Sequence, residues 1–403
     1  MSAWRSAVVV AGVAVAIAGC REQLTTPGRC PELCPSGTVV LADTLLAGAD
    51  VSDTSVRGYV GVREARYLLI SSFDSLKSVA WMRYAPRAQD TVWYVGSDTA
   101  YVGTQDSVVL TLQILQRDTF VKALRLLVYR LPPTLDTAAT YATVQGLFAD
   151  SNLIDTIAVP DTAQAGSYAF RIGDSLAVPL ADSVTLGFAL LAPSQTALTL
   201  GSGNGLSGTV APYLSYFVHA RAPLDTLAKV FAGIAPSFTL FVTSPPPSQP
   251  PAGVLAVGGM PTARATVRLS LPKEVVDSNA VVRATLLLTT AGAVGGFVRD
   301  SFTVIAQPVV RDFGVKSVLW PDSTVSGYTT VHQGQTGPVA VDIARILRFW
   351  GTASGDSTPR LIVLRVFPEG SILGSVDFVG QAAGAGGPQV QVTYVKRYTF
   401  GVP

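Results

Sequence analysis

Apolar and polar residues alternate along many short segments of this chain. Between residues 266 and 288 the apolar positions of two such segments are Val267, Leu269 and Leu271, and then Val282, Ala284, Leu286 and Leu288. Side chains of a β-strand point alternately to its two faces, so this period of two predicts two half-buried strands. The residues between them, Pro272–Asn279, include Pro, Asp, Ser and Asn and predict a surface connection.

The same pattern predicts further strands along the first half, at Val39–Leu46, Tyr67–Ile70, Thr91–Val95, Val108–Leu115 and Leu124–Leu131. One segment has a helical period instead, with apolar residues at i, i+3, i+4 and i+7, namely Ile343, Ile346, Leu347 and Trp350. Asp342 stands where it can cap the first turn, and Gly351 follows the last. An equivalent helix in the first half is expected near Tyr168–Val178.

The length of 403 residues exceeds what one hydrophobic core usually supports, so two domains are expected. The segment 244–253 holds five of the 26 prolines, and such a run forms an extended spacer that cannot join a sheet interior. We therefore predict an all-β chain of two tandem antiparallel β-sandwich (jelly-roll-like) lobes with short helices. The first lobe would span 38–243 and the second 254–403.

A faint internal repeat supports two lobes. Residues 183–218 align with 359–395, each with a strand, a turn at Pro193 or Pro368, a second strand, a Gly-rich connector and a third strand. Upstream, residues 61–69 align with 259–267.

The overall charge excludes one partner class. Charged residues make up 14% of the chain against 48% hydrophobic residues, and the net charge of +2 is not gathered into basic clusters. A nucleic-acid partner is therefore not expected.

The first twenty residues read as an export signal. Arg5 precedes the apolar run Ala7–Ala18, which is too short to span a bilayer comfortably. The quartet Ile17-Ala18-Gly19-Cys20 resembles the lipobox of bacterial lipoproteins, and that resemblance implies an acylated Cys20 as the first mature residue. Residues 1–19 would then be the signal peptide and 20–37 a tether. In Gram-negative lipoproteins an Asp directly after the acylated cysteine often marks retention in the inner membrane, so the resemblance with Arg21 at this position favours the outer membrane. The alternative is an ordinary secretory signal in which Cys20 is incidental.

The other two cysteines, Cys30 and Cys34, are candidates for a disulfide, because an exported chain meets an oxidising compartment. A zinc site would need further ligands, and the two histidines, His219 and His332, are distant in sequence. No metal site is predicted from these residues.

Aspartate followed by threonine recurs along the first half, for example at Asp43, Asp53 and Asp118. Carboxylates gathered in loops can hold calcium, so calcium is retained as a candidate ligand. The alternative is that these residues end strands and form Asx-turns.

Sugar binding by a β-sandwich relies on exposed aromatic rings. Five aromatic residues flank loop-like sequence and are candidate carbohydrate contacts: Trp93, Tyr94, Tyr101, Trp320 and Tyr328. The alternative places each of them in a core.

The second half resembles the DNRLRE-type jelly-roll domains of bacterial surface proteins. The resemblance is carried by the residues 263–272 and 282–288, by Val341-Asp342-Ile343 leading to Trp350-Gly351, and by 388–394. Thr266 and Ser270 stand where members of that family often have Phe or Asp. The resemblance implies a β-sandwich, either a carbohydrate-binding module or a non-catalytic part of a surface lipoprotein, in a chain similar to two-lobed surface lipoproteins.

These features predict a lipid-anchored envelope protein with non-catalytic domains that bind a ligand, such as polysaccharide, or serve a structural role. No catalytic residue is predicted, because no nucleophile elbow, HExxH, Walker or EF-hand spacing occurs in the sequence. Two alternatives remain open: an adhesion or assembly component with a protein partner, and a polysaccharide-degrading enzyme, which would need paired carboxylates in one cleft.

Overall fold

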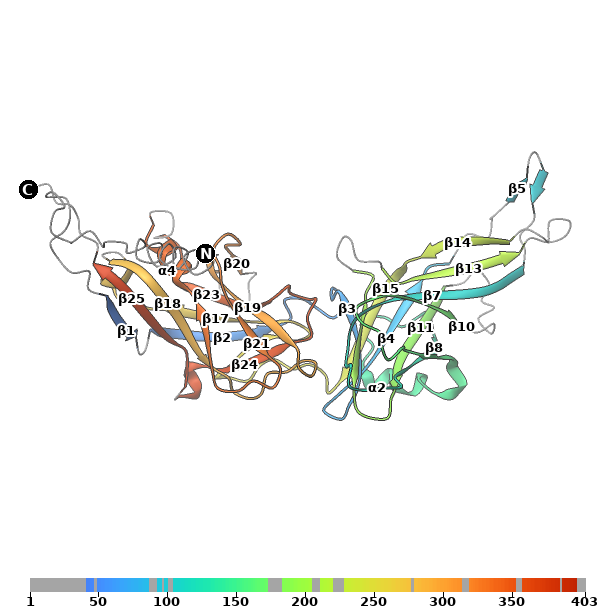
Figure 1. Cartoon of the computed structure of the whole chain (residues 1–403), viewed down its shortest axis with the longest axis horizontal. Helices are drawn as coiled ribbons and strands as arrows, with labels where there is room; N and C mark the ends of the chain where they lie inside the picture. The colour runs from blue at the N-terminus through green and yellow to red at the C-terminus, as the bar shows by residue number, and fades with distance from the viewer. Residues whose placement is uncertain are drawn as a thin grey trace, which may run out of the picture. The chain divides into compact units, whose positions relative to one another are not determined.

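The computed structural model describes residues 41–46, 49–86, 93–95, 98–100, 104–172, 183–204, 211–219, 228–276, 279–313, 319–352, 357–384 and 386–396. These residues form antiparallel sheets with a few short helices, which confirms the all-β prediction (Figure 1). Buried residues gather into two large hydrophobic cores. We name the two bodies around these cores sandwich I and sandwich II.

Sandwich I surrounds the first core and is built from one continuous stretch of chain. Its main strands are β3 (Tyr67–Phe73), β4 (Leu76–Tyr84), β7 (Thr104–Arg117), β8 (Arg125–Leu131), β9 (Leu153–Ala158), β10 (Gly166–Ile172), β11 (Val184–Leu191), β12 (Ala197–Gly201), β13 (Tyr213–His219), β14 (Ala228–Ile234) and β15 (Pro236–Ser244). They form one eleven-stranded sheet. Strands from both ends of its order share one core, so the sheet folds over onto itself. A separate hairpin joins β5 (Trp93–Val95) to β6 (Asp98–Ala100).

Sandwich II packs two sheets against each other. The first contains β1 (Ala42–Leu46), β25 (Gln389–Lys396), β18 (Asn279–Thr289) and β22 (Pro338–Asp342). The second, which we call sheet B, contains β2 (Asp50–Arg57), β16 (Val254–Gly258), β17 (Ala263–Leu269), β19 (Ser301–Arg311), β20 (Trp320–Pro321), β21 (Gly327–His332), β23 (Leu361–Phe367) and β24 (Ser375–Val379). Inward residues of both sheets meet in the second core.

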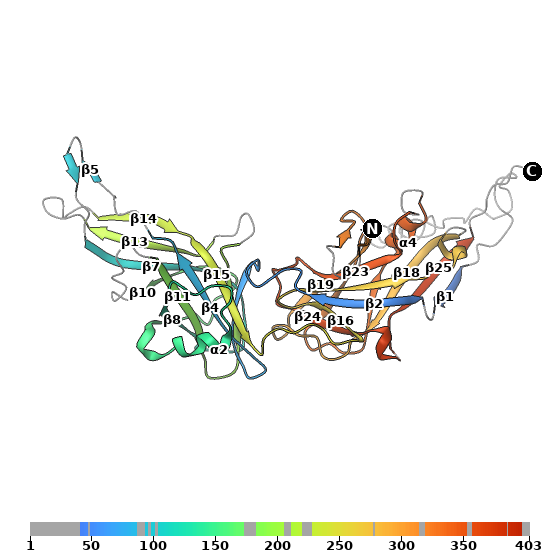
Figure 2. The ribbon, with the colours of Figure 1, turned by 180° about the vertical axis from the view of Figure 1, so that it is seen from behind.

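The first two strands lie in a different body from the one the sequence predicts. Strand β1 pairs with β25, and β2 pairs with β17 along its whole length, so residues 42–57 belong to sandwich II (Figure 1, blue among orange and red; Figure 2 from behind). The prediction of a first lobe that starts at residue 38 therefore differs from the structure. Alternation fixes which face of a strand is buried, and it does not fix the strand's partner.

The two bodies repeat the same pairing scheme strand by strand. β4 lies between β15 and β11, as β17 lies between β2 and β23. β7 pairs with β10 and β13, as β18 pairs with β22 and β25. β8 joins β9 to β11, as β19 joins β21 to β23, and β12 lies on β3 as β24 lies on β16.

This equivalence shows that the two halves exchange their first two strands. In the first half, β1 and β2 precede β3–β13; in the second half, β14 and β15 precede β16–β25. Yet β14 pairs with β13 and β15 with β4, whereas β1 pairs with β25 and β2 with β17. Each half therefore completes the sandwich of the other.

The chain crosses from one body to the other twice, before β3 and after β15. The second crossing, residues 245–253, contains no strand, as its prolines predict. It is bonded to the end of β2: the Arg57 amide donates to Gln249 Oε1 at 2.9 Å, and Gln249 Nε2 donates to the Arg57 carbonyl at 2.9 Å. The two crossing segments are thus held side by side.

The repeat predicted from sequence is partly confirmed. Residues 183–218 and 359–395 do form equivalent elements, β11–β13 and β23–β25. The upstream alignment is wrong by one strand, because residues 61–69 lead into β3, whose equivalent is β16 rather than β17.

The helical period is confirmed by α4 (Ala344–Trp350), which buries Ile346, Leu347 and Trp350 in the second core. The N-cap residue is Ile343, which makes no side-chain cap bond; Asp342, one residue earlier, accepts at Oδ1 from the Ala344 amide at 2.9 Å. The helix expected near 168–178 is wrong over residues 168–172, which form the end of β10; the rest lies outside the described residues.

The alternation in 266–288 is confirmed with one correction. β17 buries every second residue up to Leu269, and β18 buries Ala284, Leu286 and Leu288. Val282, however, is exposed and Val281 is buried, because the pairing of β18 with β25 shifts by one residue between Val281 and Arg283. The connection between the two strands contains the helical turn α3 (Lys273–Val276).

Candidate functional site

The outer face of sheet B carries a group of ion pairs. Ala263, Ala265, Val267 and Leu269 of β17 point into the core, so Arg264, Thr266 and Arg268 point the other way. Neighbouring strands place Arg365 of β23 and Gln307 of β19 on the same face, because their sequence neighbours lie in the core. Alternation alone thus assembles three arginines on one surface.

Glu369, two residues past β23, joins two of these arginines. Arg264 forms a two-pronged bond with it, Nε to Oε1 at 2.9 Å and Nη2 to Oε2 at 2.6 Å. Arg365 Nη1 lies 3.9 Å from Oε2 of the same carboxylate. Both ends of the Arg264–Glu369 pair are largely buried, so the pair is partly shielded from solvent.

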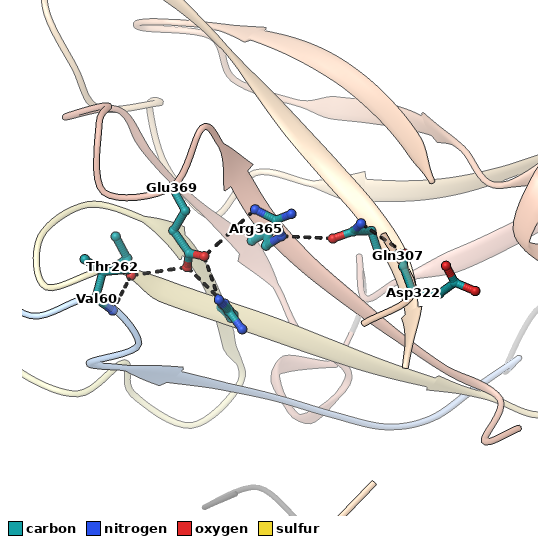
Figure 3. A network of polar contacts seen from close by, with 7 residues as sticks. Val60, Thr262, Gln307, Asp322, Arg365 and Glu369 are labelled. Atoms are coloured by element: carbon teal, nitrogen blue, oxygen red, sulfur yellow. Dashed lines mark hydrogen bonds and ion pairs between the residues drawn. The ribbon is translucent and has the colours of Figure 1, made fainter. Parts of the chain in front are cut away.

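The network continues in both directions from Glu369. On one side Thr262 Oγ1 donates to Glu369 Oε1 at 3.2 Å and accepts from the Val60 amide at 2.9 Å (Figure 3). On the other side Arg365 Nε donates to Gln307 Oε1 at 2.9 Å, and Gln307 Nε2 donates to the Asp322 carbonyl at 3.1 Å. The chain of bonds orients the side chains across the face, and it ties the residues just after β2 to β17.

Burial lowers the pKa of Arg365, and the neighbouring Arg264 acts in the same direction, whereas Glu369 opposes it. The guanidinium of Arg264 also lies over the ring of Tyr59, with Cζ 4.4 Å from the ring centroid. Both planar groups are therefore held in fixed orientations.

A cavity of about 200 Å³ opens beside this network. Its wall is formed by residues of β2, β17 and β23 and by residues next to β2, β19 and β20: Ser52, Asp53, Thr54, Val56, Tyr59, Arg264, Thr266, Arg268, Asp312, Leu319 and Leu361. Arg268 forms an ion pair with Asp312 at its rim. Hydroxyls, a paired guanidinium and apolar surface in one hollow are the groups that hold small polar ligands.

Exposed aromatic rings flank the same face. Trp320 is 54% exposed and pairs with Arg311, whose guanidinium carbon lies 5.6 Å from the indole centroid. Tyr328 is 57% exposed and pairs with Ile305, an outward residue of β19. Phe367, at the end of β23, is 52% exposed, with Arg365 above its ring at 5.9 Å.

Two of the five candidate carbohydrate contacts, Trp320 and Tyr328, are therefore exposed on one face, and neither lies in a core. Trp93 and Tyr94 lie in strand β5, and their side chains are outside the described part of the structure. Tyr101 lies wholly outside the described residues. Sequence reasoning missed Phe367, Arg264 and Glu369. The alternation of β17 could have indicated Arg264, whereas Glu369 lies 105 residues away along the chain.

The remaining sequence candidates can be placed only in part. Cys20, Cys30 and Cys34 lie outside the described residues. Several aspartates cap turns, as the alternative to calcium predicts: Asp118 Oδ1 accepts from the Phe120 amide, and Asp136 Oδ1 from the Ala138 amide, each at 2.9 Å. Across the described ranges, no group of three or more His, Cys, Asp or Glu side chains gathers at one place.

A buried carboxylate at the start of β2 was also missed. Asp50 is 3% exposed, and burial together with the nearby Asp53 raises its pKa to about 7. Asp53 Oδ2 accepts from the Gln381 amide at 2.6 Å, and Gln381 Nε2 donates to the Asp50 carbonyl at 2.8 Å. Nothing in the local sequence indicated that this polar strand is enclosed.

The corresponding face of sandwich I is apolar and covered. β4, β8 and β15, the equivalents of β17, β19 and β2, there carry Trp81, Tyr129 and Leu240 in a small separate cluster. The helical segment that contains α2 (Tyr141–Val144) packs Val144 and Phe148 against it. The equivalent face of sandwich II is mixed: Val309, Leu319, Leu361 and Val363 form a small buried apolar cluster there, beside the polar network and the cavity.

No helix in the described part of the chain is long and apolar enough to cross a membrane. The resemblance to DNRLRE-type domains stays a prediction. No protein-family model matches this chain, and no curated protein is recognisably similar to it in sequence.

Proposed function

We propose that this chain is a lipid-anchored envelope protein that binds polysaccharide through the outer face of sheet B. The observation that carries the proposal is the contrast between the two bodies. The face that sandwich I covers with a helical segment carries, in sandwich II, a cavity, oriented arginines and exposed aromatic rings beside a small buried apolar cluster.

The side chains on this face suit a sugar ligand. A pyranose presents apolar C–H faces, which stack on aromatic rings such as Trp320, Tyr328 and Phe367. It also presents hydroxyl groups, which hydrogen-bond to polar side chains such as Thr266 and Arg268 in the wall of the cavity. The ion pair with Asp312 holds the Arg268 guanidinium in place beforehand, which lowers the entropy cost of binding.

Electrophoresis in native gels that contain a neutral glucan, a mannan or polygalacturonate tests this. We expect slower migration in at least one gel, and loss of the retardation in W320A/Y328A. The variant F120A, which removes an equally exposed ring from sandwich I, is the matched control. Equal retardation of W320A/Y328A and F120A, or no retardation of the native chain in any gel, would refute binding at this face.

The proposed lipid anchor is inferred from the sequence Ile17-Ala18-Gly19-Cys20. Several acyl chains on Cys20 would hold the mature chain stably at a membrane, whereas one would do so only marginally. Mass spectrometry of the mature amino terminus is the test: we expect an acylated Cys20, and an unmodified cysteine there would remove the anchor from the proposal.

A second candidate function, assembly with a protein partner, is favoured by a separate observation. Sandwich II takes up β1 and β2, which are separated in sequence from its other strands by the whole of sandwich I, so its edges bind strands from outside its main sequence stretch. We develop this candidate in the next section.

A further inference from the structure

The strands β1 and β2 occupy an acceptor site that the rest of sandwich II leaves open. β1 adds five residue pairs to the edge of β25, and β2 adds seven to the edge of β17. Without them the backbone amides and carbonyls of both edges would lack partners, and an open edge of this kind pairs readily with another strand.

The pair is attached mainly by polar contacts. The residues of β2 opposite the core residues Ala263, Ala265 and Val267 are Arg57, Ser55 and Asp53. They bond to backbone groups: Arg57 Nη1 to the Pro261 carbonyl at 3.0 Å, and Ser55 Oγ to the Val254 carbonyl at 2.7 Å. Asp53 accepts from the Gln381 amide at 2.6 Å.

Apolar burial by this pair is small. Of residues 42–57, none of those within β1 or β2 is a buried member of the second core; Ala49 between them is, and Leu46 packs against it partly buried. Apolar burial dominates the free energy of attachment, and segments that bury little open at low cost. The pair is thus held to sandwich II mainly by backbone pairing and polar side chains.

We propose that β1 and β2 are an exchangeable strand pair, and that a second copy of this chain supplies it to the β17 and β25 edges. The donor in a second copy has the same sequence, so it satisfies the same register and the same polar bonds. Within one chain the acceptor already receives strands from the other half, so the topology does not require the donor to be covalently close.

The protein concentration decides whether β1 and β2 pair within their own chain or with a second copy. Within one molecule the donor stays near its acceptor at a high effective concentration, which favours the internal arrangement in dilute solution. Linked copies become more abundant as the protein concentration rises, because strand exchange between copies is a bimolecular association.

A mixing experiment with cysteine variants tests the proposal. Thr54 of β2 lies directly opposite Thr266 of β17, and both are half-buried on the outer face. In the chain from residue 20 on, with Cys20, Cys30 and Cys34 replaced by serine, T54C and T266C are placed in separate copies and mixed at rising concentrations under oxidising conditions. We expect a disulfide-linked dimer on denaturing, non-reducing gels, its 54–266 linkage confirmed by mass spectrometry and its yield rising with concentration.

Two controls make the result decisive. The double variant T54C/T266C reports the internal pairing, since its disulfide closes within one chain and leaves the mass unchanged. The mixture of T54C with T330C reports random collision, because Thr330 is exposed on β21 and pairs with Thr303 rather than with β2. The proposal is overturned if the double variant closes while the T54C and T266C mixture gives no dimer, or gives no more than the T330C mixture.

Discussion

The strand pairs β14–β15 and β1–β2 fill equivalent positions in the two sandwiches and are attached differently. β15 contributes buried Leu240 and Phe241, one to each hydrophobic cluster of sandwich I. β2 places Arg57, Ser55 and Asp53 at the positions opposite the core residues of β17 and bonds them to backbone groups. One topological site is thus closed by apolar burial and the other by hydrogen bonds.

The two sandwiches share one pairing scheme, yet their equivalent strands bury different amounts of apolar side chain. Sandwich I buries apolar side chains on both faces of β4, so it has no polar face left open there. The equivalent face of sandwich II combines a small apolar cluster with a polar network and a cavity, and its edge pair contributes little to the second core. We therefore expect truncation of a side chain that attaches the edge pair to cost sandwich I more than the β2 region of sandwich II.

The largest expected effect is in Phe241→Ala. Phe241 is 1% exposed, and its ring stacks on Tyr67 with centroids 5.9 Å apart. Loss of a fully buried ring leaves a cavity, so we expect sandwich I to lose about 3–4 kcal/mol of unfolding free energy. Denaturant unfolding followed by hydrogen exchange in β4 and β13 measures it.

The matched change in β2 is Ser55→Ala, which removes the bond to the Val254 carbonyl and the one from the Ala256 amide at 3.1 Å. We expect a loss of about 1–2 kcal/mol, confined to the exchange protection of sandwich II. Equal losses in the two variants would contradict the contrast between burial and hydrogen bonding.

The next effect is in Glu369→Gln, which removes the negative charge shared by Arg264 and Arg365. Two partly buried guanidinium groups would then face each other without a counter-ion, and we expect a loss of about 2–3 kcal/mol in sandwich II. Thermal unfolding together with exchange at Val60 reports both stability and the tie to the end of β2.

Asp312→Asn serves as its control, because the Arg268–Asp312 pair is more exposed and a pair of that kind contributes up to about 1 kcal/mol. If the two variants lose the same stability, burial of the Glu369 network has no role in holding β2.

The sequence predicts the parts of the fold that depend on local periodicity. The alternation of β17 and the helical spacing of α4 identified buried residues correctly, including Trp350. β2 was missed, because its sequence Asp-Val-Ser-Asp-Thr-Ser-Val-Arg lacks an apolar side and its strand is stabilised by partners that are distant in the chain. The exposed rings of Trp320 and Tyr328 were named, yet their common face depends on pairing with β19, which periodicity does not encode.

A smaller effect concerns pH and Asp50. In the attached strand its pKa is raised to about 7, against an ordinary value of 3.8 expected when β2 is detached. The attached state then binds more protons between these values, so attachment is strongest below about pH 4 and weakens as the pH rises to about 7. Above about pH 7 the contribution of Asp50 protonation to attachment is lost, and attachment no longer changes with the ionisation of Asp50.

We expect exchange protection of the β17 amides, corrected for intrinsic rates, to fall by about tenfold from pH 5 to pH 8. Asp50→Asn should flatten this dependence. Asp322→Asn, which alters a carboxylate whose pKa is lowered by its bonds to Thr324, should leave it in place. Persistence of the full pH dependence in Asp50→Asn would assign it to other groups.

The smallest effects distinguish the two faces of β1. Leu45 is largely exposed opposite Gln391, whereas its neighbour Leu46 packs against the second core opposite Val390. We expect Leu46→Ala to cost about 1–2 kcal/mol, because it removes partly buried apolar area, and Leu45→Ala to stay within about 0.5 kcal/mol of the native chain. Urea unfolding of the two variants measures both. A loss in Leu45→Ala as large as that in Leu46→Ala would mean that the outer side of β1 is covered in solution, for instance by a second copy, and that β1 is held from both sides.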